Sequence, residues 1–369
     1  MLGVGAGIDR RLVYNVDWVL LGTTLVLSAV GVAMVYSATH AGQRPDLYLK
    51  QLTLVGVGLV GMALAAAIDY RRLADRAVLL YVLSLLALVY VLRFGPVIAG
   101  TRRWILIGGF QLQPSELVKL AAAVFAAKVF SEMRHESLGL REVALPGAAL
   151  GVLALLIARE PDLGTAACLV PLFLAVAFLA GLRMRAVFGL AVVLLLTAGV
   201  AWTYFLKDYQ KTRIYTFLDP SLDPKRAGYQ MIQSQIAVGS GGFVGRGFGQ
   251  GSQAQLGYLP ARHTDFIFSV LAEETGFVGV FATLSLYLLL LWRMLETARL
   301  ARDRLGAFLV AGVSAAFAFQ VVYNVGMVAG LVPVKGLPLP LMSYGGSSIL
   351  SSLMGIGLVL SVRMRRFAN

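Results

Sequence analysis

Long apolar runs recur along this chain, and they constrain its fold more than any other feature of the sequence. A helix that crosses a bilayer needs about 20 apolar residues, and fewer where it is buried in a bundle. The sequence therefore predicts an all-α polytopic membrane protein, a bundle of about ten transmembrane helices. The predicted spans are Trp18–Tyr36, Leu49–Ile68, Ala77–Leu92, Leu117–Phe130, Ala144–Ile157, Gly164–Leu182, Ala186–Leu206, Phe266–Trp292, Ala307–Leu331 and Ser347–Val362.

The composition agrees with a membrane protein. Hydrophobic residues make up 58% of the chain and charged residues 14%, whereas soluble domains carry roughly a quarter charged residues. The net charge of +13 raises nucleic acid as a partner, but the basic residues lie between apolar runs and form no basic face with interleaved aromatics. We therefore expect membrane lipids and no nucleic acid as partners. The single cysteine, Cys168, excludes an intrachain disulfide and a thiolate metal site.

Basic residues predict the orientation in the membrane. One set of short loops and tails is rich in arginine, and the positive-inside rule places it, with both termini, in the cytoplasm. The opposite face includes a large extracytoplasmic loop, Lys207–Thr264, between the seventh and eighth spans. We expect one integral membrane domain, 1–369, with its unusual chemistry on the extracytoplasmic side. The basic set is Arg10, Arg11, Arg71, Arg72, Arg76, Arg134, Arg141, Arg183, Arg185, Arg293, Arg299, Arg302, Arg304, Arg363, Arg365 and Arg366.

Asp265 stands where the large loop ends and the eighth span begins. Thr264 is predicted to be the N-cap, which would place Asp265 in the first helical turn, where the helix dipole favours an ionised carboxylate. Asp265, Ser269 and Glu273 would then share one face of the helix. A carboxylate at a membrane boundary is costly unless it is used. Capping acids are common, however, so spacing alone leaves a structural and a functional role equally open.

Charged and aromatic residues precede the fourth span. Pro114 suits a first helical turn, and Glu116 and Lys119 stand three residues apart on one helix face. They are either an ion pair that stabilises the bundle or a charge pair at the floor of a cavity. Trp104, beside Arg103, is either an interfacial anchor or a ring that stacks on a sugar.

Three further polar stretches have a structural and a functional interpretation. Asp162 either caps the following helix or contacts a substrate. The run Gly239–Gly251 could cradle phosphate with its backbone N–H groups, but it lacks a Walker lysine, so a flexible surface loop is favoured. Lys335 could neutralise a phosphate to which Ser343 and Ser347 hydrogen-bond. Alternatively, this segment is a proline-broken helix whose serines cap the last span.

Taken together and in order, these stretches resemble the SEDS family (shape, elongation, division and sporulation proteins), and within it the RodA group. The resemblance covers nearly the whole membrane region, and the stretches around Asp265 and after Lys335 are the most specific. It rests on Arg103-Trp104, Gln113-Pro-Ser-Glu116 with Lys119, Pro161-Asp-Leu-Gly164, His263-Thr-Asp-Phe-Ile-Phe268, Gly336-Leu-Pro-Leu-Pro340 and Ser343-Tyr-Gly-Gly-Ser-Ser348.

The resemblance implies a peptidoglycan glycosyltransferase of the bacterial cytoplasmic membrane that polymerises lipid II outside the membrane. It also implies a class B penicillin-binding protein, a transpeptidase, as partner, and Asp265 as the catalytic acid-base residue. One base suffices for an inverting displacement, with cations stabilising the departing undecaprenyl pyrophosphate. Arg103, Arg213 and Lys335 are the candidate cations. A divalent cation (Mg²⁺ or Mn²⁺) could bridge the pyrophosphate, although the sequence offers no protein cage for it.

Two other functions compete with polymerisation. A flippase for the same lipid would also have many spans and intramembrane charges. The unusual residues gather on one face, however, and the sequence has no inverted repeat. A scaffold that only positions a partner enzyme would not explain a polar outer cavity.

Overall fold

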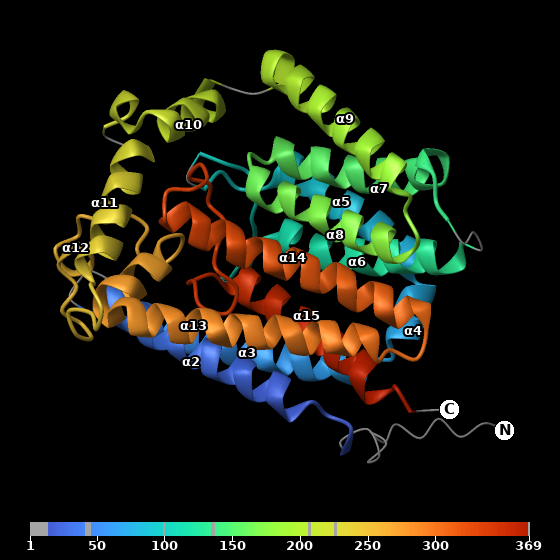
Figure 1. Cartoon of the computed structure of the whole chain (residues 1–369), viewed down its shortest axis with the longest axis horizontal. Coiled ribbons are helices and arrows are strands. Elements are labelled where there is room, and N and C mark those ends of the chain that lie inside the picture. Colours follow the sequence, from blue (N-terminus) through green and yellow to red (C-terminus); the bar gives the residue numbers. More distant parts are fainter. Residues whose placement is uncertain are drawn as a thin grey trace.

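The computed structural model describes residues 14–40, 46–98, 100–108, 110–133, 137–205, 208–224 and 227–367. Most long helices lie side by side along one common direction, and their connections gather at two ends (Figure 1). Arg10, Arg11 and Arg134 of the predicted basic set, and Lys207 at the start of the predicted large loop, lie outside the described residues.

The described elements are helices, apart from one short hairpin. The long helices are α2 (Trp18–Thr39), α3 (Leu47–Ala67), α5 (Ala77–Phe94), α6 (Pro114–Glu132), α7 (Leu140–Arg159), α8 (Leu163–Leu179), α9 (Met184–Val200), α13 (Ile267–Arg299), α14 (Arg304–Val328) and α15 (Gly346–Met364). Shorter elements are α4 (Tyr70–Asp75), η1 (Ala201–Phe205), α10 (Asp208–Leu218), η2 (Pro220–Leu222), α11 (Ala227–Ser240), α12 (Ser252–Gln255), and the strands β1 (Ile105–Ile107) and β2 (Phe110–Leu112).

Each of the ten predicted spans coincides with a long helix. Eight of the described helices are long and apolar enough to cross a membrane, namely α2, α3, α5, α7, α9 with part of η1, α13, α14 and α15. Helix α8 is apolar but has 17 residues, and α6 carries charged residues near both ends. The chain is therefore a multi-pass membrane protein, while the number of ten spans remains a prediction.

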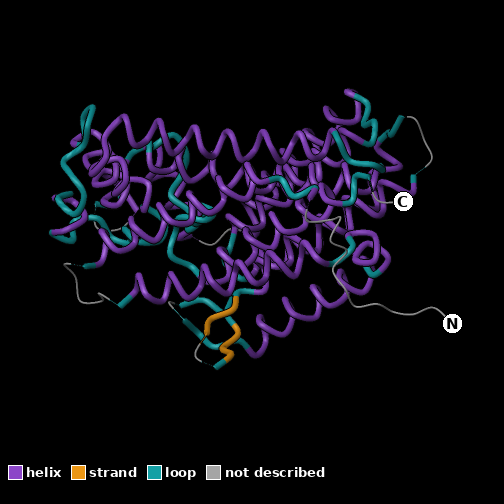
Figure 2. Tube along the Cα trace, turned by 90° about the horizontal axis from the view of Figure 1, so that it is seen from below, coloured by secondary structure: helices purple, strands orange, loops and turns teal. Residues whose placement is uncertain are grey.

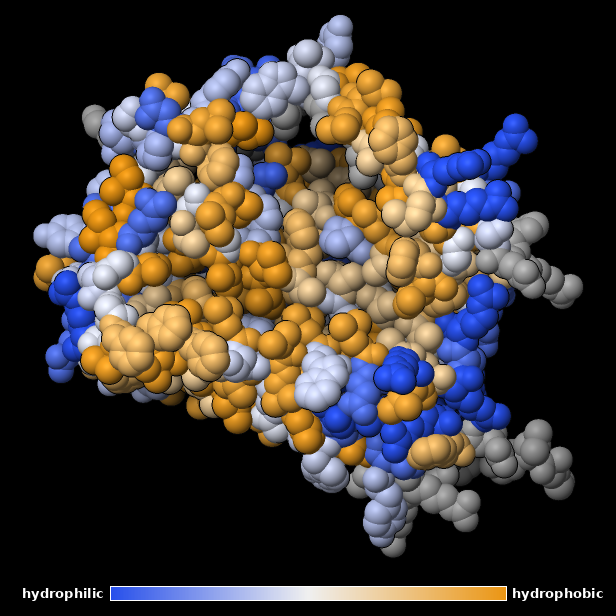
Figure 3. All heavy atoms as spheres, in the orientation of Figure 1, coloured by the Kyte–Doolittle hydropathy of each residue, from blue (hydrophilic) through white to orange (hydrophobic). Residues whose placement is uncertain are grey.

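The two ends of the bundle differ in composition. At one end, called the arginine end below, lie α4, the connection between α13 and α14, and the last turn of α15 (Figure 1). The arginines of these segments were predicted to face the cytoplasm. At the opposite end, called the loop end, lie α10, α11, α12 and the start of α13. Figure 3 shows apolar side chains across the middle of the molecule and hydrophilic ones toward its ends, as a bilayer-crossing protein requires.

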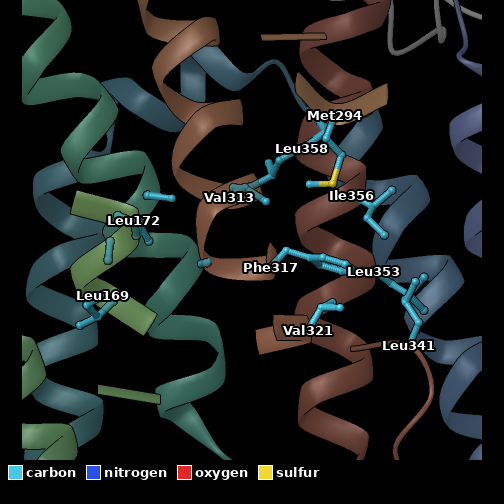
Figure 4. Close-up of a cluster of buried hydrophobic side chains, with 14 of the residues drawn as sticks. Leu169, Leu172, Met294, Val313, Phe317, Val321, Leu341, Leu353, Ile356 and Leu358 are labelled. Carbon is cyan, nitrogen blue, oxygen red and sulfur yellow. The ribbon is translucent and has the colours of Figure 1, made fainter. Parts of the chain in front are cut away.

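Helices α14 and α15 form the centre of the bundle. In the apolar stretch of α15, 89% of the residues are buried, against 7% in α9, which lies at the edge. Figure 4 shows Phe317 and Val321 of α14 directed toward α15, where Leu353 is completely buried. The serine side chains at the start of α15 are therefore held by a well-packed helix.

The glycine run Gly239–Gly251 is part of the folded structure. Helix α13 breaks at Gly276, whose backbone (φ 62°, ψ −160°) is one that glycine adopts far more readily than other residues. The run packs into this break, where the N–H of Phe277 donates to the carbonyl oxygen of Gly242 (3.0 Å) and further backbone hydrogen bonds join the same two segments. Most of the run is exposed, as predicted for a surface loop, but it also supplies backbone partners that the broken helix lacks.

Candidate active site

Asp265 lies in the turn before α13, at the loop end. The N-cap residue of α13 is Phe266, and the first turn of this helix contains no acidic residue. The Thr264 hydroxyl donates to the carbonyl oxygen of Ala261 (3.2 Å), so the predicted cap at Thr264 is wrong. The chain turns instead of starting the helix here, because Ala261 adopts a left-handed backbone conformation (φ 52°), which few residues other than glycine take up.

The predicted common face of Asp265, Ser269 and Glu273 does not form. Asp265 precedes α13 and so does not follow the helical spacing. The hydroxyl of Ser269 hydrogen-bonds with that of Ser234 (2.9 Å). Glu273 accepts from the backbone N–H of Gln253 (2.9 Å) and thereby holds α12. Asp265 is the member of this trio that faces the other charged residues at the loop end.

The segment between α14 and α15 fixes the turn that carries Asp265. The amide of Asn324 donates to the carbonyl oxygens of both Asp265 and Leu337, at 2.9 Å each. The hydroxyl of Ser343 donates to the carbonyl oxygen of Thr264 (2.6 Å). Since Asn324 and Ser343 are buried, these bonds hold the backbone of Asp265 in one position.

The side chain of Asp265 is partly buried, and charged groups from three other segments act on it electrostatically. Burial raises the pKa of Asp265 to about 6, and the negative charge of Asp162 contributes to the rise, since both disfavour the ionised form. The positive charges of Arg103 and Arg213 act in the opposite direction and lower this pKa. Gly336 lies against the same carboxylate, since a Cβ atom built there would be 3.4 Å from Oδ2 of Asp265. The fold therefore gathers predicted site residues from four separate segments around Asp265.

Asp162 has the predicted structural role and a further one. Its carboxylate caps α8 by accepting from the N–H of Thr165 (3.1 Å), which confirms the predicted cap. It also accepts from the side-chain amide of Gln113 (2.6 Å) and from the hydroxyl of Ser115 (3.4 Å). Asp162 therefore joins the start of α8 to the start of α6, beside Asp265.

Glu116 and Lys119 form the predicted ion pair. The Lys119 Nζ atom is 2.9 Å from Oε2 of Glu116, and their side chains are 6% and 2% exposed. The hydroxyl of Ser351 donates to the same oxygen of Glu116 (2.7 Å). The pair links α6 to α15, and contact of either residue with a substrate remains a prediction.

Ser343 and Ser347 use their hydroxyls within the protein. Ser347 accepts from the N–H of Gln113 (2.7 Å) and donates to the carbonyl oxygen of Gln111 (3.2 Å). It thereby attaches the β1–β2 hairpin, orange in Figure 2, to α15. The N-cap of α15 is Gly345, with no side-chain cap, so the prediction that these serines cap the last helix is wrong. Their hydroxyls form hydrogen bonds with distant segments instead of capping the helix.

The remaining predicted residues lie at the same end. Burial and the positive charge of Arg213 lower the pKa of Lys335, because both disfavour a second cation there. Arg213 also donates to the carbonyl oxygen of Val334 (3.4 Å), so α10 and the α14–α15 segment bring two cations together. The guanidinium of Arg103 lies 5.5 Å from the ring centroid of Trp104, within cation–π range. A role of Trp104 in stacking on a sugar remains a prediction.

The described residues offer no site for a resident metal ion. No group of three or more His, Cys, Asp or Glu side chains among them is placed to hold one. A hard divalent cation takes six or more oxygen ligands, so an ion here would need most of its ligands from a substrate.

The sequence analysis assigned no individual role to three polar residues at the site. Gln113 and Asn324 connect separate segments through side-chain amides, and Glu160 is a completely buried acid at the corner before α8. Polar amides within apolar spans were an available signal for Asn324. Gln113 and Glu160 are close in sequence to residues that we had selected as candidates. Only their surroundings in the folded structure show that they differ from those neighbours.

Comparison with known proteins supports the resemblance that the motifs indicated. The family model described as "Cell cycle protein", covering FtsW, RodA and SpoVE, matches residues 12–367. Peptidoglycan glycosyltransferase MrdB of Escherichia coli K12 is 38% identical over 361 residues, which covers 95% of each chain. Stage V sporulation protein E of Bacillus subtilis is 39% identical over 357 residues, 94% of this chain and 96% of its own.

Solved structures agree as well. A chain of a peptidoglycan synthase complex, described as coordinating polymerization and crosslinking, superposes with a TM-score of 0.83 at 36% identity, covering 96% of this chain and 99% of its own. RodA of Thermus thermophilus superposes with a TM-score of 0.72 at 32% identity, covering 96% and 98%. The family match spans almost the whole chain, and it confirms the resemblance derived from the motifs. This chain belongs to the FtsW/RodA/SpoVE family, the SEDS proteins.

Proposed function

We propose that this protein is a peptidoglycan glycosyltransferase that polymerises lipid II into glycan strands and releases undecaprenyl pyrophosphate. The observation that carries the proposal is Asp265, a carboxylate fixed at its backbone and faced by two arginines. Relatives that are 38% and 33% identical to this chain are named peptidoglycan glycosyltransferases, MrdB and RodA. By analogy with them, we assign the activity to cell-wall elongation and rod shape.

Asp265 acts as the general base in this proposal. Its carboxylate takes the proton from the 4-hydroxyl of the acceptor sugar while the hydroxyl oxygen attacks the anomeric carbon of the donor. A positioned base of this kind contributes about 10²–10⁴-fold. With a pKa of about 6, Asp265 is mostly ionised at neutral pH. This pKa is also close enough to 7 for the carboxylate to accept a proton readily.

Cations near Asp265 stabilise the leaving group. The bond between the anomeric carbon and the pyrophosphate oxygen breaks, and its electron pair leaves on undecaprenyl pyrophosphate. Arg103, Arg213 and Lys335 are our candidates to face that negative charge. Preorganised cations in a partly dry site do so without reorganising at the moment of reaction. A divalent cation on the pyrophosphate would add charge stabilisation, with ligands that come mainly from the substrate.

We place the arginine end in the cytoplasm and the loop end outside. The short basic connections at the arginine end fit the positive-inside rule, and lipid II displays its disaccharide on the outer face. We also propose a class B penicillin-binding protein as partner. The support is the 0.83 TM-score to a chain from a complex that joins polymerization with crosslinking.

Incubating purified protein with lipid II in detergent, alone and with a partner transpeptidase, tests the function. Detergent offers no two compartments, so a polymerase still forms glycan chains there while a flippase has nothing to do. We expect glycan strands that depend on Asp265. A protein that makes no glycan with a suitable partner but moves lipid II across liposome membranes would instead be a flippase.

Cysteine labelling tests the orientation. In a Cys168→Ser background, a cysteine at position 335 should react with an impermeant reagent from outside, and one at position 299 only from inside. Labelling of position 299 from outside would reverse the proposed topology.

A further inference from the structure

Glu160 is a buried acid that the proposed chemistry does not use. It ends α7 and is 0% exposed. Among the described residues, neither of its carboxyl oxygens has a hydrogen-bond partner. An ionised carboxylate in such a place is unfavourable unless a cation or hydrogen-bond donors compensate it.

Arg103 is the cation that faces Glu160. The charged groups acting on Glu160 within the described chain are Arg103, from the segment before β1, and Asp162, two residues further on. Arg103 and Glu160 form no ion pair there, and the Nε atom of Arg103 is itself buried without a hydrogen-bond partner. The charge of Arg103 also acts on Asp162 and on Asp265. The charge of one guanidinium group thus acts on three carboxyl groups.

Which carboxyl group Arg103 approaches depends on the charge that each one carries. If Glu160 were ionised, it would attract Arg103 most strongly, because it has no other compensation. If Glu160 is neutral, Arg103 stays available to Asp265 and to an anionic ligand. The absence of an ion pair between Arg103 and Glu160 in the described structure fits the neutral form.

We propose that Glu160 works as a neutral carboxylic acid and is a positioning residue, leaving Arg103 free to face the pyrophosphate of a lipid-linked substrate. This inference rests on the proposed function. When Glu160 releases its proton to solvent, its carboxylate draws Arg103 away and the site loses affinity for the anionic substrate. Glu160 thereby acts through Arg103 and does not touch the substrate.

The pH at which this change occurs follows from the surroundings of Glu160. Burial, and secondly the negative charge of Asp162, raise the pKa of Glu160 to about 8, whereas Arg103 lowers it, as expected for a carboxyl group between a carboxylate and a guanidinium. As pH rises from 7 to 9, Glu160 passes from mostly protonated to mostly ionised. If only the neutral form leaves Arg103 available, the KM for lipid II should increase about tenfold over this range.

Glu160→Gln tests the inference because an amide keeps the shape of the neutral acid but cannot ionise. We expect its KM at pH 7 to stay within about twofold of the wild type, and the rise between pH 7 and 9 to shrink to less than twofold. Glu132→Gln, at an exposed position on α6 (64% side-chain exposure), is the matched control and should keep the wild-type rise. If Glu160→Gln still makes glycan and its KM rises between pH 7 and 9 as in the wild type, this inference is overturned while the proposed function stands.

Arg103→Gln provides the second arm, which remains informative if Glu160→Gln folds poorly. Its KM should be higher than that of the wild type at pH 7 and should vary less than twofold up to pH 9. A wild-type-like rise in Arg103→Gln would also overturn the inference. A wild-type protein that makes no glycan at any pH would overturn the proposed function, and this inference with it.

Discussion

At the arginine end, buried and half-buried charges meet as ion pairs, whereas the charges around Asp265 at the loop end do not. Arg293 contacts Asp17 at 2.7 Å, and Arg71 contacts Asp303 at 2.8 Å. Within the described chain, Asp265 and Arg103 form no ion pair. Charges that meet in ion pairs compensate one another within the fold, while charges held without an ion pair are available to a ligand. The comparison distinguishes charges paired within the fold from the charges that we propose act on a substrate.

Asp265→Asn should have the largest effect, because it removes the proposed base without changing the shape of the turn. We expect glycan synthesis from lipid II to fall about 10²–10⁴-fold in a protein that still inserts and elutes as a folded species. Asp303→Asn, at the arginine end, is the control and should keep most of the activity. Normal synthesis by Asp265→Asn at neutral pH would place the base elsewhere.

Glu116 and Lys119 should be energetically coupled, as expected for an ion pair within the bundle like those at the arginine end. Removing one partner leaves the other buried and unpaired, at about 3 kcal/mol in stability. Replacing both should cost clearly less than the sum of the two single changes. Unfolding of Glu116→Gln, Lys119→Met and the double variant in detergent measures the coupling, and additive effects would mean that the two groups do not interact.

Asp17→Asn should destabilise the arginine end without affecting catalysis. Asparagine retains the cap that Asp17 provides to the N–H of Leu20 (3.0 Å) but removes the charge that Arg293 and Arg363 share. We expect a loss of about 2 kcal/mol, below the range for fully buried pairs because Arg293 is partly exposed. Asp17→Ala, which also removes the cap, should be less stable still. Lost glycan synthesis with unchanged thermal stability would contradict this division between the two ends.

The acid side of the pH profile should report Asp265. The base must be ionised to take a proton, and its ionised fraction grows as pH rises through about 6. The rate of glycan synthesis should therefore fall as pH drops below 6, by about tenfold for each further unit. Glu160→Gln should keep this acid limb. A rate that stays constant from pH 7 to pH 5 would argue against Asp265 as the base.

The helices were predictable from sequence because a bilayer imposes a length and an apolar character on each span. Asp162 as a cap, and Glu116 with Lys119 as a pair, were predictable because their partners lie within three residues. The cap at Thr264 was wrong for the complementary reason. Ser343, 79 residues away, binds the Thr264 carbonyl and holds a turn where local signals favour a helix.

The rest of the site depends on contacts between distant segments. Asn324 joins the backbones of Asp265 and Leu337, and no pattern within one segment indicates that bond. Glu160 shows the same limit, since its burial and its neighbour Arg103 become known only in the fold. The sequence therefore indicated the candidate reactive groups but not the residues that position them.

The break in α13 also limits how this family member can vary. Residues 241–247 lie outside the long helices, yet the carbonyl groups of Gly242 and Phe243 accept from the N–H groups of Phe277 and Val278. An insertion or deletion there would leave backbone groups of a membrane helix without partners, which is costly at the bilayer boundary. An insertion or deletion beside the exposed Asp219 would not leave such groups without partners. During synthesis, the run emerges before the helix that it completes, so the loop end cannot reach its final packing until α13 has been inserted.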